Sequence, residues 1–379
     1  MTHLLVIAFL AAALYFAQRL IYTKLWAKNL SAFVGFSENE ITEGERGELI
    51  EIVTNDKKLP LIMLKVKFLT SRHLKFDNSL NTQNTDNYYR HDIFRLWGGE
   101  RLQRIIKFTA VKRGFYKIDS AEIVTTDLFY TKQMVAVVNF QTELYVLPKP
   151  IFTDGMNMFL QWINGEILSR KQIYEDPFEY RGIREYQPYD PMKDINWKAT
   201  AKTGDLRVNL HGYTSLKCVR IFLNLEDSGI FKKENLVENA ISIAAGMVSC
   251  FLNQGMELSF YCNAVDPLNN RPVAFEKRSG GWYEKEIYRS LARIDIRKPV
   301  DFNEEYEQML NSDSGSMFDF IITVNLYDNF VEMLQKRKIT ASNDYALLCP
   351  VDNDEIPVLP EDVNSHLQLI RMSDMEVTA

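Results

Sequence analysis

The sequence predicts an α+β multidomain protein with an N-terminal transmembrane helix, a β-sandwich domain and a C-terminal α/β domain. Three patterns predict it: an unbroken apolar run near the N-terminus, short segments that alternate apolar and polar residues, and strands that alternate with helices in the C-terminal part. The predicted parts are a membrane anchor (1–28), a β-sandwich domain (29–150), a linker (151–217) and an α/β domain (218–379).

The N-terminal anchor is predicted from residues 4–17, which are all apolar. The apolar character continues to Tyr22, which brings the stretch near the roughly 20 residues that a spanning helix needs. Arg19 interrupts it close to one end, where a long side chain can extend to the membrane surface. Tyr15, Tyr22 and Trp26 add the aromatic residues that are frequent at membrane interfaces.

A cleaved signal peptide and a buried soluble helix are the alternatives to this anchor. A signal peptide has a basic start and a small-residue cleavage site, and neither pattern accompanies this run. Arg19, Lys24 and Lys28 follow the run and no basic residue precedes it. The positive-inside rule therefore predicts a single-pass protein of the cell membrane with its main body in the cytoplasm.

The β-sandwich is predicted from alternating segments with turn residues between them. These segments are residues 30–41, 48–55, 59–69, 101–110, 114–124 and 141–146. Residues 77–92 are polar and rich in Asn, which predicts a long loop or hairpin tip.

The α/β domain is predicted from short apolar strands that alternate with helical patterns, as in a parallel sheet. The predicted strands are residues 218–225, 257–263, 318–324 and 345–349, and the predicted helices are residues 235–255, 283–294 and 328–338. The four cysteines, Cys218, Cys250, Cys262 and Cys349, form no CxxC pair and lie in apolar surroundings. They predict free thiols in a reducing compartment, without a disulfide or a zinc site.

Residues 181–209, called the signature segment below, interleave charged, aromatic and turn residues without a helical or strand period. One interpretation is a hydrogen-bonded connector in which Trp197 and Tyr186 pack on a neighbouring sheet. The other is a recognition surface, with Arg184 paired to a carboxylate and Trp197 as an apolar anchor. The candidate interaction residues are Arg184, Glu185, Tyr186, Pro188, Asp190, Asp194, Trp197 and Lys198.

The signature segment resembles that of bacterial domain-of-unknown-function family 58, whose pattern runs roughly G-x-R-E-Y-x-P-G-D-x-x-R-x-I-x-W-K-x-(S/T)-A-R. The matching positions are Gly182, Arg184, Glu185, Tyr186, Pro188, Asp190, Ile195, Trp197, Lys198, Thr200 and Ala201. Tyr189 replaces the usual Gly, and Lys193 and Lys202 replace the usual Arg. Residues 44–61, 112–116 and 127–129 also resemble the family.

The resemblance implies a membrane-anchored protein whose C-terminal domain is similar to von Willebrand factor type A. Such proteins are often encoded beside MoxR-type AAA+ ATPases and transglutaminase-like membrane proteins. The implied function is that of an adaptor or scaffold, with a MoxR-type AAA+ ATPase as the expected protein partner.

Type A domains often bind a divalent cation through a D-x-S-x-S loop after the first strand, and residues 224–230 hold the corresponding place. The pattern is degenerate here, because Ile230 replaces the second Ser when Glu226 is aligned with the Asp. The candidate residues of this weak site are Asn224, Glu226, Asp227 and Ser228. We therefore expect no metal or other cofactor. A Mg²⁺-dependent protein-binding module remains an alternative, because hard cations prefer such oxygen ligands.

Catalysis is not expected. The five histidines are scattered, and the G-x-S-x-G, H-E-x-x-H and P-loop patterns are absent from the sequence. Asp190 and Asp194 are a further alternative, as paired carboxylates of a hydrolase. The net charge of −6 gives no general attraction to nucleic acid, so no nucleic-acid partner is expected.

Overall fold

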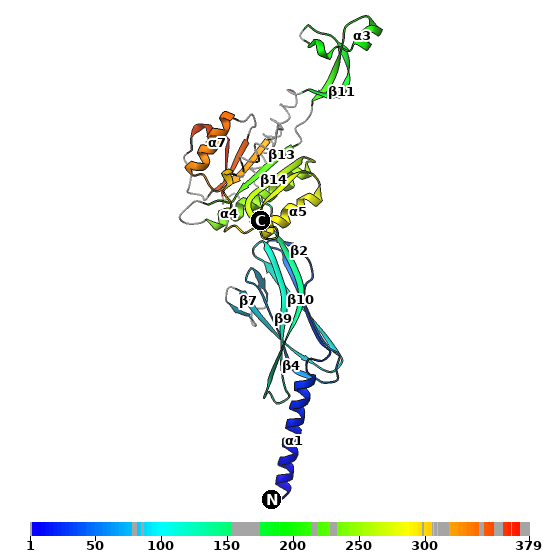
Figure 1. The fold of residues 1–379 in the computed structure, drawn as a ribbon, viewed down its shortest axis with the longest axis vertical. Helices are drawn as coiled ribbons and strands as arrows, with labels where there is room; N and C mark the ends of the chain where they lie inside the picture. Colours follow the sequence, from blue (N-terminus) through cyan, green and yellow to red (C-terminus); the bar gives the residue numbers. More distant parts are fainter. Residues whose placement is uncertain are drawn as a thin grey trace. The chain divides into compact units, whose positions relative to one another are not determined.

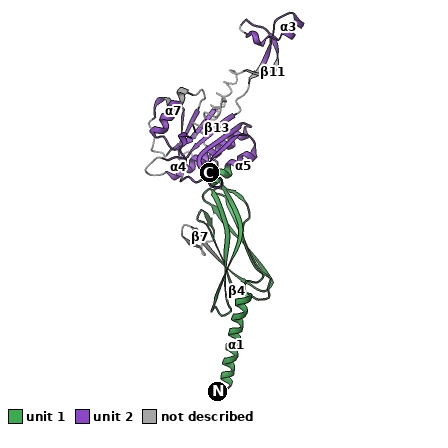
Figure 2. Ribbon diagram, viewed as in Figure 1, with its two compact units in different colours: residues 1–149, 288–294 green, residues 150–287, 295–379 purple. Residues whose placement is uncertain are grey.

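The computed structural model describes residues 2–77, 82–84, 87–152, 175–188, 190–213, 218–227, 233–297, 299–304, 306, 309, 318–340, 345–351, 359–364 and 366–371. The chain divides into two compact units, coloured separately in Figure 2. Unit 1 comprises residues 1–149 and 288–294, and unit 2 comprises residues 150–287 and 295–379.

Unit 1 begins with helix α1 (Thr2–Leu25) and continues as a β-sandwich of two sheets (Figure 1). One sheet has the strand order β1-β3-β8-β5, and the other has the order β2-β10-β9-β4-β7-β6. All neighbouring strands are antiparallel except β2 and β10. The strands are β1 (Leu30–Phe36), β2 (Glu40–Thr42), β3 (Arg46–Asn55), β4 (Leu61–Ser71), β5 (Leu74–Phe76), β6 (Thr82–Asn84), β7 (Asn87–Leu96), β8 (Glu100–Ala110), β9 (Gly114–Thr126) and β10 (Gln133–Leu147).

The core of the sandwich follows from the alternation along its strands. In β3 every second residue is buried, and Leu49 and Val53 are 0% and 1% exposed. Successive side chains of a strand point to opposite faces, so one face of each strand reaches the shared core. A single cluster of buried residues joins side chains from both sheets.

The C-terminal end of α1 is part of that core. Tyr22 and Trp26 are 2% and 8% exposed and belong to the buried cluster of the sandwich. The Tyr22 hydroxyl also donates a hydrogen bond of 2.8 Å to the Pro60 carbonyl. Apart from the half-buried Tyr15, the apolar residues from Leu4 to Leu20 are exposed, and the helix is long and apolar enough to cross a membrane.

Unit 2 contains a six-stranded sheet with the order β15-β14-β13-β16-β17-β18. The strands are parallel except for β15 at one edge. The elements are β13 (Cys218–Asn224), α4 (Glu234–Asn253), β14 (Glu257–Asp266), β15 (Arg271–Arg278), α5 (Gly281–Arg293), β16 (Phe318–Thr323), α7 (Asp328–Thr340), β17 (Tyr345–Val351), α8 (Glu361–Asn364) and β18 (Leu367–Arg371). The division into units assigns α5 to unit 2 up to residue 287 and to unit 1 from residue 288. Helix α4 also has the length and composition of a membrane span, but it is mostly buried and lies against four strands of this sheet.

Two edge strands of this sheet, β15 and β18, are absent from the sequence-based prediction. Strand β15 reads RPVAFEKR and is largely exposed, and β18 has only five residues. Edge strands are covered less completely than central ones, so they need no continuous apolar run. In unit 1, β10 begins at Gln133 rather than at residue 141, and β7 occupies part of the polar stretch 77–92.

A buried ion pair joins the two central strands of unit 2. Arg220 on β13 and Asp319 on β16 are register partners and are 1% and 0% exposed. The guanidinium donates from Nε to Oδ1 at 2.7 Å and from an Nη to Oδ2 at 3.1 Å. A charge removed from water in this way is tolerated only when its partner is present.

We expect Asp319→Asn to destabilise unit 2 by about 3–5 kcal/mol, because it leaves the Arg220 charge buried and uncompensated. The double variant Arg220→Met with Asp319→Leu should recover most of this loss. Labelling of the buried Cys218 and Cys262 thiols at increasing urea concentration monitors unfolding. It measures the free energy of unfolding of both variants. A single variant as stable as the parent protein would show that the pair does not constrain the sheet.

Candidate functional site

The signature segment is folded around two antiparallel strands, β11 (Glu175–Glu185) and β12 (Arg207–Tyr213). Between them lie a 3₁₀ turn, η1 (Met192–Asp194), and a short helix, α3 (Trp197–Thr203), visible with β11 in Figure 1. The sequence pattern indicated neither these two strands nor helix α3. Isolated strand pairs bury little apolar surface, so their sequences lack a strong alternation.

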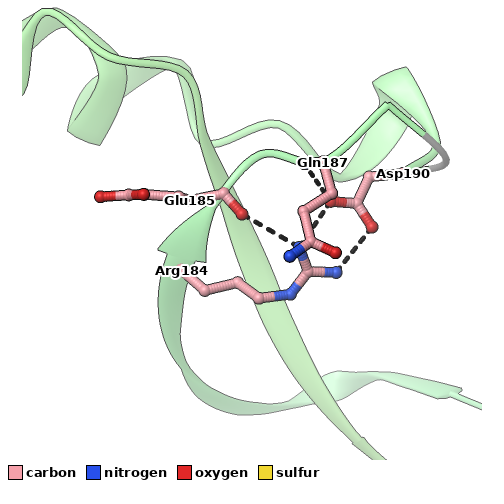
Figure 3. Close-up of polar contacts among 4 residues, drawn as sticks. All are labelled: Arg184, Glu185, Gln187 and Asp190. Atoms are coloured by element: carbon pink, nitrogen blue, oxygen red, sulfur yellow. Dashed lines mark hydrogen bonds and ion pairs between the residues drawn. The ribbon is translucent and has the colours of Figure 1, made fainter.

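Arg184 and Asp190 form a bidentate ion pair at the end of β11 (Figure 3). The two guanidinium Nη atoms lie 2.5 Å and 2.6 Å from the two carboxylate oxygens of Asp190. The same carboxylate accepts a hydrogen bond of 2.8 Å from the Gln187 backbone N–H, and Arg184 also donates to the Glu185 carbonyl at 3.0 Å. Paired planar groups of this kind fix geometry as well as adding energy. The Arg184–Asp190 pair therefore holds the chain where it leaves β11.

The surroundings of Asp190 favour its ionised form. The hydrogen bond from Arg184 is the main cause that holds the pKa of this carboxyl below its usual range, and the Gln187 N–H lowers it further. Desolvation acts in the opposite direction but is outweighed. Both carboxylate oxygens are engaged, so the group is arranged for structure rather than for proton transfer.

Helix α3 is fixed at both ends by its own sequence. The Asn196 side chain accepts a hydrogen bond of 2.9 Å from the Ala199 N–H, as an N-cap residue does, and donates to the Asn209 side chain at 2.7 Å. Gly204 ends the helix with a φ of 80°, a left-handed conformation that glycine adopts without strain. Ile195 bridges to Val208 on β12, and both are buried.

Large apolar side chains on this frame are exposed. Met192 and Trp197 are 74% and 65% exposed, so Trp197 does not pack on a sheet. Ile183, Leu206 and Leu210 are also more than a third exposed. Glu185 is exposed and lies 3.5 Å from the Arg207 guanidinium, Pro188 and Lys198 are exposed, and Tyr186 and Asp194 are half-buried. Exposed aromatic and Met side chains on an ordered frame are typical of protein-binding surfaces.

The candidate cation loop after β13 is held by a pair of asparagines. The Asn224 side-chain oxygen accepts hydrogen bonds of 3.0 Å from both the Glu226 N–H and the Asn263 side chain. The Asn263 oxygen accepts from the Leu225 N–H at 2.9 Å. Asn263 lies on β14 and was not singled out by its sequence. Asp227 accepts from the Lys233 N–H at 2.7 Å, and Ser228 lies outside the described residues.

A polar cavity of about 300 Å³ lies at the carboxyl ends of β13 and β16. Its lining includes the carboxylates Glu226, Asp301 and Asp328 and the amides Asn303 and Asn325. The chain order reverses between β13 and β16, and this is the position at which open α/β sheets usually bind ligands. Within the described ranges, no three His, Cys, Asp or Glu side chains are grouped as metal ligands.

No protein-family model matches the sequence, and no curated protein matches it. Solved structures that resemble part of it include the CARDB domain of PF1109 from Pyrococcus furiosus, at 14% identity over 31% of this chain and 93% of that one, with a TM-score of 0.21. A cohesin module of a family 33 glycoside hydrolase from Clostridium perfringens gives 6% identity over 31% and 97%, with a TM-score of 0.24. Alpha-2-macroglobulin from Escherichia coli gives 15% identity over 45% and 10%, with a TM-score of 0.24. Likeness at this level carries no functional inference.

We expect Asp190→Asn to loosen the signature segment, because a neutral amide offers one acceptor oxygen where the carboxylate offers two. The backbone N–H of Gln187 should then exchange with solvent faster in hydrogen-exchange measurements. Asp205→Asn is the matched control, because Asp205 is exposed in the same segment. Equal protection of Gln187 in both variants would contradict the structural role of the pair.

The same ion pair predicts a pH dependence with a definite sign. The folded pKa of Asp190 is depressed, so its contribution is fully present above the unfolded value of about 3.9 and is lost as the pH falls through the folded pKa. In Arg184→Gln, NMR titration of the Asp190 carboxyl should show a higher pKa than in the parent protein. An unchanged pKa would show that Arg184 is not its cause.

Proposed function

We propose that this protein is a membrane-anchored, non-enzymatic adaptor that binds a protein partner through the signature segment. The observation that carries the proposal is the exposure of Trp197 and Met192 on a segment fixed by the Arg184–Asp190 pair. An ordered frame lowers the entropy lost when these side chains are immobilised by a partner. Trp is also among the residues that dominate binding energies at interfaces.

The proposed anchor is helix α1, uncleaved, with the rest of the chain in the cytoplasm. Tyr22 and Trp26 support retention of the helix, because cleavage after Tyr22 or Trp26 would remove side chains from the sandwich core. The basic residues Arg19, Lys24 and Lys28 follow the apolar run, which supports a cytoplasmic body.

The proposed partner is a MoxR-type AAA+ ATPase in an envelope-related complex, as the family resemblance implies. The sheet of unit 2 supports a domain similar to von Willebrand factor type A. With its strands numbered along the chain, the order is 3-2-1-4-5-6, with the third strand antiparallel at the edge. The carboxyl end of β13, where such domains present their binding loop, is lined here by Glu226 and Asn325.

The two alternatives have less support. A cation at the loop after β13 would need the Asn224 oxygen as a ligand, but two N–H donors already occupy it. A hydrolase would need Asp190 as an acid, base or nucleophile, but Arg184 and Gln187 engage its carboxylate. The hydrogen bonds at Asn224 and at Asp190 therefore do not favour a metal site or a catalytic carboxylate over a protein-binding function.

The proposal is tested by recovering partners of tagged full-length protein from detergent-solubilised membranes of its host. We expect a MoxR-type ATPase with the parent protein, and weaker binding with Trp197→Ala. Truncation of a central interface aromatic costs about 2 kcal/mol, which corresponds to roughly thirtyfold in Kd. Biosensor titration with the purified ATPase measures the change.

Trp282→Ala is the matched control, because Trp282 is 71% exposed but lies on α5. Loss of binding in both variants would indicate a nonspecific effect of removing a surface tryptophan. Equal binding by Trp197→Ala and the parent protein would place the interface outside the signature segment. Recovery without any ATPase would contradict the proposed partner.

A further inference from the structure

We propose that the turn between β9 and β10 is a second membrane contact, in which Leu128, Phe129 and Tyr130 enter the lipid bilayer at the boundary between headgroups and acyl chains. The proposal rests on the proposed anchoring through α1, and it adds a lipid-binding surface to the sandwich itself. Its occupant is the bilayer that surrounds the anchor.

The turn presents three consecutive apolar side chains to solvent. Leu128, Phe129 and Tyr130 are 38%, 54% and 58% exposed, and Tyr130 has a φ of 58°, which is rare for an aromatic residue. Asp127, only 2% exposed, holds this conformation. Its carboxylate accepts hydrogen bonds from the N–H groups of Thr131 at 2.6 Å and Lys132 at 3.2 Å. The exposed apolar side chains are therefore displayed by a fixed turn.

This turn lies against α1, within the apolar run. The rings of Tyr15 and Phe129 are 5.9 Å apart, and the Tyr15 hydroxyl donates to Thr131 Oγ1 at 3.2 Å. One helical turn further, Gln18 Nε2 donates to the Asp127 carboxylate at 3.3 Å. These residues share a helix face with Tyr22 in the sandwich core, so several contacts set the position of the turn along the helix.

The length of the helix then decides where the bilayer must lie. The exposed apolar residues before Tyr15 are 4–14, which span only about 16 Å at 1.5 Å per residue. The hydrocarbon core is about 30 Å thick. Residues 4–22 span about 28 Å, which is sufficient. If α1 crosses the bilayer, the hydrocarbon core therefore extends past Tyr15 toward Tyr22. Phe129 lies at the level of Tyr15, so it lies up to about 10 Å inside the boundary of the hydrocarbon core. Amphipathic interfacial segments are buried to about 5–10 Å.

The neighbouring loops have the composition of a membrane interface. Trp97 is 58% exposed, and its carbonyl accepts a hydrogen bond of 2.9 Å from the Asn55 side chain. Asn55 also donates to Leu59, beside the Pro60 carbonyl that binds Tyr22. Aromatic residues concentrate at bilayer interfaces, and basic residues are attracted to anionic headgroups. The basic residues of these loops and of the adjoining end of α1 are Arg19, Lys24, Lys28, Lys57, Lys58 and Lys132, and Arg95 lies near the end of β7.

The test places a bimane fluorophore at single cysteines in the full-length protein, reconstituted into phosphatidylcholine–phosphatidylglycerol vesicles. Cys250→Ser removes the one native cysteine that is not buried. The probes are Phe129→Cys at the turn, Leu10→Cys on α1, and Val137→Cys on β10. Val137 is 59% exposed, and its strand carries it about 20 Å from the turn. Brominated lipids quench a fluorophore only where lipid chains reach it.

We expect quenching at positions 10 and 129 and none at position 137. Quenching at position 10 without quenching at position 129 would overturn the second membrane contact and leave the anchor intact. Without quenching at position 10, the anchoring itself fails, and the contact that rests on it fails too. Quenching at all three positions would show that the sandwich lies flat on the bilayer, which contradicts a contact confined to the turn. The melting temperature of each labelled variant verifies that it is folded.

Discussion

The burial of Tyr22 and Trp26 in the sandwich core is the constraint on which the account of unit 1 depends. It makes the C-terminal end of the apolar helix a part of the folded sandwich. The helix therefore has a fixed direction and a fixed depth relative to the sandwich. Every element that touches the same helix face, including the turn at Phe129, then takes a definite level along the helix axis. The proposed anchoring and the structure of the sandwich therefore depend on the same contacts.

Unit 2 combines buried or partly buried polar pairs with exposed apolar side chains. The Arg220–Asp319 pair ties the two central strands, and the paired side chains of Asn224 and Asn263 order the loop at their carboxyl ends. In the signature segment, the Arg184–Asp190 pair and the capped helix α3 hold Trp197 in an exposed position. In each region, buried or partly buried polar pairs provide order, and the side chains available to a partner lie beside them. The proposed binding function rests on this arrangement.

Sequence patterns predicted the elements whose burial is strongly periodic. The apolar helix, the alternating strands and the buried strands β13, β16 and β17 all carry a residue pattern that their surroundings require. The edge strands β15 and β18 and the pair β11–β12 were missed, because strands with little cover need no apolar alternation. Within the site, the sequence indicated that Arg184 pairs with a carboxylate. It did not indicate that Asp190 is this partner. The roles of Gln187, Asn196 and Asn263 depend on contacts that the chain makes only when folded.

The most direct measurement of the central claim is the intact mass of the protein extracted from alkali-washed membranes of its host. Alkali releases peripheral proteins and leaves integral ones in the bilayer. We expect a membrane-retained chain whose mass includes the residues of α1, because Tyr22 and Trp26 belong to the sandwich core. A soluble protein, or a mature chain that begins after Trp26, would contradict the anchor and the adaptor function built on it.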